Sequence, residues 1–209
     1  MNEPLKLMIG VPAYRGQVHY GHIMQMMSMC SVTFAARGLL SLRGITCPES
    51  CSIDWSRNQI LHYALKDGSD WVLMCDADTY HTNAADLVRM IEEARIKGAA
   101  VVASPVKMRG RAGYNVFTAG DASEKRIVPS DEFAGKVLEV DRIGTACMAV
   151  NCGWIRDRWA DQPWFVTQHL PGVAPSKVGE DVAFCDGVRS RGGVILADGR
   201  FEPRHIGAE

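Results

Sequence analysis

The sequence predicts an α/β domain in which a mostly parallel β-sheet carries helices on both faces. Short apolar runs alternate with helical patterns along most of the chain, which is typical of parallel strands joined by helices. Residues 71–75 and 99–103 are apolar throughout, as expected for strands covered on both sides. The length of 209 residues suits one domain, and no repeat or low-complexity linker divides it.

Composition and charge narrow the class of protein. Apolar residues make up 47% and charged residues 22% of the chain, and the formal net charge is -1. This balance excludes a strongly basic nucleic-acid sleeve and an acidic disordered tail, while leaving room for a local basic patch. The chain has seven cysteines, no signal-peptide pattern and no apolar run near the roughly 18 residues of a membrane span. We therefore expect a reduced, cytoplasmic protein without a membrane span, with mostly buried cysteines.

The strands are expected where apolar runs stop at Pro, Gly or polar residues. In the first half these runs cover residues 5–11, 39–46, 71–75 and 99–103. In the second half they cover residues 114–118, 137–140, 145–150 and 194–197. The first of these second-half strands interrupts a long polar excursion at 107–135, and loops of that length are usually functional or mobile.

Helices are expected between these strands, with apolar residues at helical spacing. The first, residues 21–37, has an apolar face expected to point inward, made of Ile23, Met26, Met27, Cys30 and Phe34. The second begins at Asp54 or Ser56 as its cap and ends at Gly68; the third runs from Thr82 or Asn83 to Lys97. Two further helices are expected at 153–159 and 182–191.

Two aspartates follow the buried run 71–75 directly, in the sequence Asp76-Ala77-Asp78. Side chains two residues apart on an extended chain point to the same side, with Cα atoms ~6.5–7 Å apart. The carboxyl end of a buried strand is also where ligands bind in open α/β sheets. Two carboxylates this close call for a cation, and oxygen ligands suit Mg²⁺ or Mn²⁺. Alternatively, the pair only caps the following turn.

Three more features add to this signal. Arg57 lies near the start of the second helix, from which a guanidinium could reach a diphosphate or a base. Glu180 and Asp181 begin the last helix, where the helix dipole favours carboxylates. His205 follows the last strand, and its imidazole could complete the coordination of a metal. Each also has a plainer interpretation: a surface salt bridge, a helix cap and a solvated histidine.

In order along the chain, these residues resemble the motifs of the nucleotide-sugar glycosyltransferases of the GT-A fold. The resemblance is to the group that includes the catalytic domains of cellulose and hyaluronan synthases. The matching segments are 9–14 (IGVPAY), 56–58 (SRN), 72–78 ending in Asp-x-Asp, 140–150 (with IGT at 143–145), 179–182 (GEDV) and His205. A Gln-x-x-Arg-Trp motif is absent, so processive polymer synthesis is not expected.

The resemblance implies a single Rossmann-like GT-A domain with a nucleotide-binding half, about 1–104, and an acceptor-side half, about 105–209. It implies Mn²⁺ or Mg²⁺ held by Asp76, Asp78 and His205, and bridging the diphosphate of a sugar nucleotide, with a UDP-sugar as the expected donor. It implies Asp181 as the general base, with Glu180 as the alternate. The residues implied in nucleotide binding are Val11, Pro12, Ala13, Tyr14, Arg15, Arg57, Asp76 and Ala77. Inverting and retaining chemistry both stay open.

The resemblance implies that the acceptor is a hydroxyl group of a saccharide or of a hydroxymethylated pyrimidine in DNA. The second acceptor is included because small GT-A enzymes of bacteriophages modify such bases. The net charge weighs against a DNA duplex as acceptor. A sugar-phosphate nucleotidyltransferase is the rival enzyme, but its Gly-rich loop after the first strand is absent. A silent nucleotide-sugar or carbohydrate-binding module is the rival outside enzymes, although such a module needs no base beside a metal.

Three other groupings have a plainer interpretation. His19, His22, Cys47 and Cys51 could bind zinc, but they lie on separate predicted elements and lack the usual Cys-x-x-Cys spacing. The basic cluster at 107–111 (Lys107, Arg109 and Arg111) forms a solvated loop or a lid. Trp154, Trp159 and Trp164 belong to the core or stack on a sugar or base.

Overall fold

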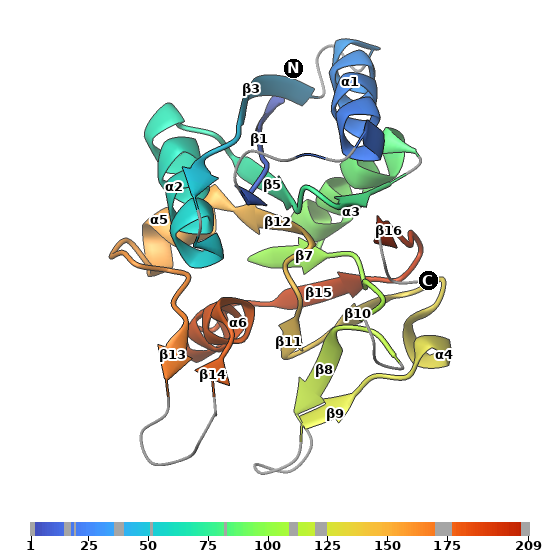
Figure 1. Cartoon of the computed structure of the whole chain (residues 1–209), viewed down its shortest axis with the longest axis vertical. Coiled ribbons are helices and arrows are strands. Elements are labelled where there is room, and N and C mark those ends of the chain that lie inside the picture. Colours follow the sequence, from blue (N-terminus) through green and yellow to red (C-terminus); the bar gives the residue numbers. More distant parts are fainter. Residues whose placement is uncertain are drawn as a thin grey trace.

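The computed structural model describes residues 3–14, 18, 20–35, 40–50, 52–81, 83–108, 113–119, 125–169 and 177–205. Within these residues, a seven-stranded sheet crosses the middle of the molecule in the order β10-β15-β7-β12-β5-β1-β3 (Figure 1). In that order the strands are Val137–Glu139, Ile195–Asp198, Val101–Ala103, Cys147–Asn151, Trp71–Cys75, Leu5–Gly10 and Leu40–Thr46. β12 is antiparallel to β5 and β7, and β10 is antiparallel to β15; the other five strands share one direction. The predicted α/β domain with a mostly parallel sheet is confirmed.

Helices cover both faces of this sheet (Figure 1). They are α1 (Tyr20–Ala35), α2 (Ile53–Asp67), α3 (Ala84–Ile96), α4 (Ser130–Phe133), α5 (Cys152–Arg158) and α6 (Glu180–Ser190). Among the described residues, no helix is both long and apolar enough to span a bilayer.

The apolar runs of the strands are explained by two cores, one on each face. Side chains alternate across a strand, so Val72 and Met74 of β5 join the core under α2, α5 and α6, whereas Leu73 joins the core under α1 and α3. All five residues of β5 are buried. A central strand therefore has no polar position until it leaves the sheet at Asp76.

Smaller pairings border the sheet. β2 (Ala13–Tyr14) pairs with β4 (Glu49–Ser50), and β6 (Thr79–Tyr80) pairs with β16 (Arg204–His205). The excursion expected at 107–135 contains more structure than one strand. β8 (Val116–Ala119) pairs with β9 (Lys125–Ile127) and β11 (Arg142–Ile143), and α4 follows β9; β13 (Gln168–His169) pairs with β14 (Lys177–Val178).

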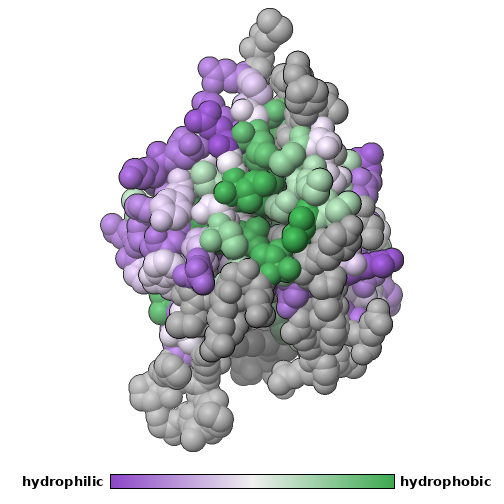
Figure 2. Space-filling model, turned by 45° about the horizontal axis from the view of Figure 1, so that its top comes forward, coloured by the Kyte–Doolittle hydropathy of each residue, from purple (hydrophilic) through white to green (hydrophobic). Residues whose placement is uncertain are grey.

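The predicted inward face of α1 is wrong. Ile23 and Met27 are 47% and 61% exposed, and Cys30 is exposed, whereas Gln25 and Met29 are buried. Of the predicted residues, Met26 does pack against the core, and the side chain of Phe34 lies outside the described residues. The helix is rich in methionine on several sides, so periodicity alone does not choose a face. The oxygen of the Gln25 side chain accepts a hydrogen bond from the backbone N–H of His81, which favours burial of the Gln25 face. Figure 2, which brings α1 and β3 forward, shows an apolar patch on this end of the molecule.

The start of α2 also differs from the prediction. Its N-cap residue is Ser52, rather than Asp54 or Ser56, and the hydroxyl of Ser56 donates to the carbonyl of Ser52. The predicted stop is confirmed, because Gly68 has a φ of 77° and donates its N–H to the last turn, a left-handed conformation that glycine adopts without strain. Asn83 caps α3 by accepting from the N–H of Ala85.

His81 is a buried imidazole next to the end of β7. It is 4% exposed, and its Nε2 lies 3.1 Å from the hydroxyl oxygen of Ser104. Burial lowers the pKa of His81 from 6.5 to about 4, although the carboxylate of Asp198 acts in the opposite direction. The imidazole is therefore neutral in the folded protein at neutral pH.

The stability of the protein should fall in mild acid because of His81. The unfolded chain takes up a proton below pH 6.5, whereas the folded chain does so only near pH 4. Stability is thus lost as the pH falls between these values, by about 2 kcal/mol from pH 7 to pH 5. Urea titrations should show this loss in the wild type and in His62→Gln, and a much smaller loss in His81→Asn. Equal pH dependence in the wild type and His81→Asn would contradict the assignment.

Candidate functional site

The candidate site lies at the sheet edge where β1, β5, β7 and β15 end. Asp76 is the first residue beyond β5; its N–H donates to the carbonyl of Ala146, and its carbonyl accepts from the N–H of Thr79 at 2.9 Å. These bonds close a tight turn that carries Asp76, Ala77 and Asp78, all half-buried. The two carboxylates therefore emerge from a rigid, fully buried strand at the edge where open α/β sheets bind ligands.

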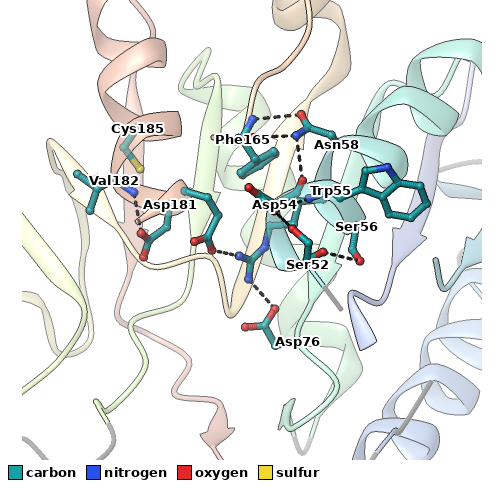
Figure 3. A network of polar contacts seen from close by, with 12 residues as sticks. Ser52, Asp54, Trp55, Ser56, Asn58, Asp76, Phe165, Asp181, Val182 and Cys185 are labelled. Atoms are coloured by element: carbon teal, nitrogen blue, oxygen red, sulfur yellow. Dashed lines mark hydrogen bonds and ion pairs between the residues drawn. The ribbon is translucent and has the colours of Figure 1, made fainter. Parts of the chain in front are cut away.

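Arg57 connects this turn to α6, within the network of polar contacts that Figure 3 draws around Asp76 and Asp181. Its Nη2 lies 2.7 Å from Oδ1 of Asp76, and its Nη1 donates to Oε1 of Glu180. The side chain of Arg57 is only 3% exposed, against 25% for Asp76 and 16% for Glu180. A buried guanidinium requires such partners, because an unpaired charge there costs several kcal/mol. One side chain of α2 thus sets the separation of two acidic groups from β5 and α6.

Asn58, the next residue, holds a different part of the chain. Its Oδ1 accepts from the backbone N–H groups of Trp164 and Phe165, and its Nδ2 donates to the carbonyls of Asp54 and Phe165. The ring of Phe165 stacks on Phe184 of α6, with centroids 4.1 Å apart. Arg57 and Asn58 therefore both position α6, one through its first residue and the other through its buried face.

Asp181 has a separate environment from Glu180, although they are neighbours at the start of α6. Its Oδ1 accepts from the N–H of Val182 at 2.7 Å, at the positive end of the helix dipole. A Cβ at Gly179 would lie 2.6 Å from this oxygen, so the carboxylate position depends on glycine there. The carboxylate of Asp181 is thus held by the backbone of its own helix, whereas the carboxylate of Glu180 is held by Arg57.

His205 reaches the aspartate turn through a strand pairing. In the antiparallel pair of β16 and β6, the partner of His205 is Thr79, the residue after Asp78. The side chain of His205 lies outside the described residues. Among the described side chains, no three from His, Cys, Asp and Glu gather closely enough to hold a metal ion.

The segment expected to bind the nucleotide follows β1. Val11, Pro12 and Ala13 are buried, and β2 places Ala13 opposite Glu49 of β4. The side chain of Tyr14 and all of Arg15 lie outside the described residues. This segment begins at the same sheet edge as Asp76, because Gly10, the last residue of β1, pairs with Met74 of β5.

The other groupings are only partly described. Cys47 is exposed, and Lys107 is exposed as well. His19, Cys51, Arg109, Arg111 and the side chain of His22 lie outside the described residues. The tryptophans support the core interpretation: Trp164 is 2% exposed, and Trp154 and Trp159 pack against the same core.

The double pairing of Arg57 was not predicted, although the sequence contained a signal for it. Arg57 lies three, four and seven residues before Ile60, Leu61 and Ala64, all of which are buried on the inner face of α2. A charged residue within such an apolar stripe has to find partners inside the fold. Which partners it finds depends on the sheet order, and the sequence pattern does not reveal that.

Comparisons with known proteins show the fold. No protein-family model matches the sequence, and no curated protein matches it. The crystal structure of A197 from STIV superposes with a TM-score of 0.62 at 16% identity, covering 97% of this chain and 85% of that one. A 4-diphosphocytidyl-2C-methyl-D-erythritol synthase from Anaerococcus prevotii DSM 20548 matches with a TM-score of 0.46 at 14% identity, over 92% and 87%. The chain shares the α/β fold of A197.

Removing the Arg57 guanidinium should destabilise the fold strongly. Arg57→Met leaves Asp76 and Glu180 facing each other without their shared cation, and we expect a loss of about 3 kcal/mol in the free energy of unfolding. Arg43→Met is the matched control: its guanidinium also pairs with an aspartate, Asp67, but is 41% exposed, so its loss should stay below about 1 kcal/mol. Urea unfolding measures both values. Equal losses in the two variants would contradict the structural role of Arg57.

Proposed function

We propose that this chain is a glycosyltransferase that moves a sugar from a nucleoside-diphosphate sugar, a UDP-sugar, to a hydroxyl acceptor with the help of Mn²⁺ or Mg²⁺. The observation that supports this most is the pairing of β16 with β6, which brings the backbone of His205 beside the Asp76-Ala77-Asp78 turn. Segments that are far apart in sequence thus meet where β5 leaves the sheet, as we expect if Asp78 and His205 hold one ion.

The donor groups suit the proposed ion. Asp78 offers carboxylate oxygens, which Mn²⁺ and Mg²⁺ bind together with substrate phosphates, and His205 would add a ring nitrogen. Oδ1 of Asp76 already accepts from the guanidinium of Arg57. We therefore assign Asp76 a position beside the ribose or a metal-bound water. When bound, the ion would neutralise the negative charge that develops on the departing diphosphate.

Asp181 is the proposed general base. In an inverting transfer, the acceptor oxygen bonds to the anomeric carbon as its proton passes to the Asp181 carboxylate, and the bond from that carbon to the diphosphate oxygen breaks. The alternate, Glu180, is less suited because Arg57 donates to its Oε1 in an ion pair, so this oxygen already has a partner inside the fold. Arg57 acts in this proposal as a positioning residue for Asp76 and Glu180.

Binding of the donor should depend on the metal. We expect UDP or a UDP-sugar to raise the melting temperature of the protein with Mn²⁺ or Mg²⁺ present, and to have little effect in chelator, because the ion joins the diphosphate to Asp78. A panel of nucleotides and nucleotide sugars in a thermal-shift assay measures this. Equal stabilisation in chelator would contradict the metal site. A metal-dependent shift by nucleoside triphosphates alone would favour the nucleotidyltransferase.

Substitutions at two aspartates should separate donor binding from transfer. Asp181→Asn should keep the metal-dependent thermal shift but lower kcat/KM by about 10²–10⁴-fold, the usual contribution of a general base. Asp78→Asn should lose both, and Asp157→Asn on the exposed side of α5 should change neither. Transfer can be followed as UDP release with saccharide and hydroxymethylated DNA acceptors. Normal transfer by Asp181→Asn would refute its assignment as base.

A further inference from the structure

An aromatic pocket lies at the same sheet edge as the aspartate turn. Its volume is about 70 Å³, and it is lined in part by Pro105, Tyr114, Ser130, Phe133, Phe201 and Glu202. Pro105 follows the end of β7, and Phe201 follows the end of β15. The pocket therefore opens where these two strands end, as the turn at Asp76 does for β5. At about 10–15 Å³ for each water it has room for roughly five waters, enough for one side of a small ring.

Backbone hydrogen bonds and close packing contacts fix the walls of the pocket. The N–H of Gly199 donates to Lys136 and its carbonyl accepts from Gly135, so the chain after β15 is fixed against α4. A Cβ at Gly199 would lie 2.1 Å from the carbonyl oxygen of Phe133, which makes glycine necessary for this close approach. The rings of Tyr114 and Phe133 meet edge to face, with centroids 5.1 Å apart.

The polar groups of the pocket have a defined orientation. The hydroxyl of Tyr114 donates to Oε1 of Glu202 at 2.7 Å, and this bond raises the pKa of Tyr114 to about 12. The phenol thus stays protonated and holds the Glu202 carboxylate at the pocket, where it can accept hydrogen bonds from ligand hydroxyls. Ser130 adds a hydroxyl that can donate or accept.

These features fit a neutral, hydroxylated ring better than a cation. Aromatic faces pack against the C–H groups of a sugar, while a carboxylate accepts from its hydroxyls. The guanidinium carbon of Arg200 lies 5.2 Å from the centroid of Phe201, so one face of this ring is already in contact with a cation.

The pocket is joined to the proposed metal site by one short segment. Glu202 and His205 are three residues apart, so their Cα atoms are at most about 11 Å apart, and His205 pairs with Thr79 beside Asp78. We propose that this pocket binds the acceptor and that the acceptor carries a pyranose ring, a proposal that rests on the transfer function proposed above.

Saturation-transfer NMR with methyl glycosides of common hexoses tests this on the full chain, without donor. We expect saturable binding of at least one glycoside. Phe201→Leu, which keeps an apolar side chain but removes the aromatic face, should weaken binding about three- to tenfold. Glu202→Gln should weaken it about tenfold. The matched controls, Tyr63→Leu and Glu139→Gln, change an exposed aromatic residue and a glutamate that do not line the pocket, and should bind as the wild type does.

The possible results separate the two proposals. Absence of glycoside binding, or binding that neither pocket variant weakens, overturns the acceptor pocket. Binding of tetramethylammonium with the same sensitivity to Phe201→Leu, without glycoside binding, overturns it as well. If UDP binds with Mn²⁺ in the wild type and in both pocket variants while no glycoside binds, only the pocket fails. If glycosides bind through Phe201 and Glu202 but UDP never does, the transfer function fails and the carbohydrate pocket stands.

Discussion

The site depends on a guanidinium that is almost completely removed from water. Arg57 can be buried on the inner face of α2 only because Asp76 and Glu180 approach it from β5 and α6. The dependence is mutual, since two acidic groups this close would repel each other without the cation between them. The pairing therefore fixes where the aspartate turn and the start of α6 lie relative to one another. Asp78 and Asp181, the residues with the main proposed roles, are neighbours of this pair.

Two adjacent residues of α2 hold α6 and the segment at Phe165 in place. Arg57 fixes the first residue of α6, and Asn58 fixes the backbone at Phe165, whose ring packs on Phe184 in the middle of α6. Consecutive residues on a helix point about 100° apart, so one turn of α2 can reach the sheet edge and the loop beyond α5 at once. This geometry explains why the residues Ser56-Arg57-Asn58 occur together at the start of α2.

The sequence predicted the elements whose environment is uniform. β5 was predicted within its true bounds because both of its faces are buried, so each residue had to be apolar. The inner face of α1 was not, since its methionines satisfy more than one orientation and a polar residue, Gln25, turned out to be buried. The ends of α2 show the same contrast: glycine marked the C-terminus by its backbone conformation, whereas several Ser and Asp residues could have marked the N-terminus.

For the candidate site, the sequence predicted the sheet edge at which the aspartate pair lies, but not the contacts around it. The aspartate pair was placed at the carboxyl end of a buried strand by its position after β5. The partners of Arg57 were not foreseeable, because they depend on the order of strands and on the packing of α6. The aromatic pocket was not foreseeable either, since Tyr114, Phe133 and Phe201 come from three separate segments with no shared pattern.

The most direct test of the proposed donor site is the position of the metal ion. Crystals grown with Mn²⁺ and UDP, measured at a wavelength where manganese scatters anomalously, would locate it without assumptions about the acceptor. We expect one strong anomalous peak in contact with a carboxylate oxygen of Asp78, the imidazole of His205 and the diphosphate. A nucleotide bound elsewhere, or manganese bound without Asp78 and His205, would contradict it.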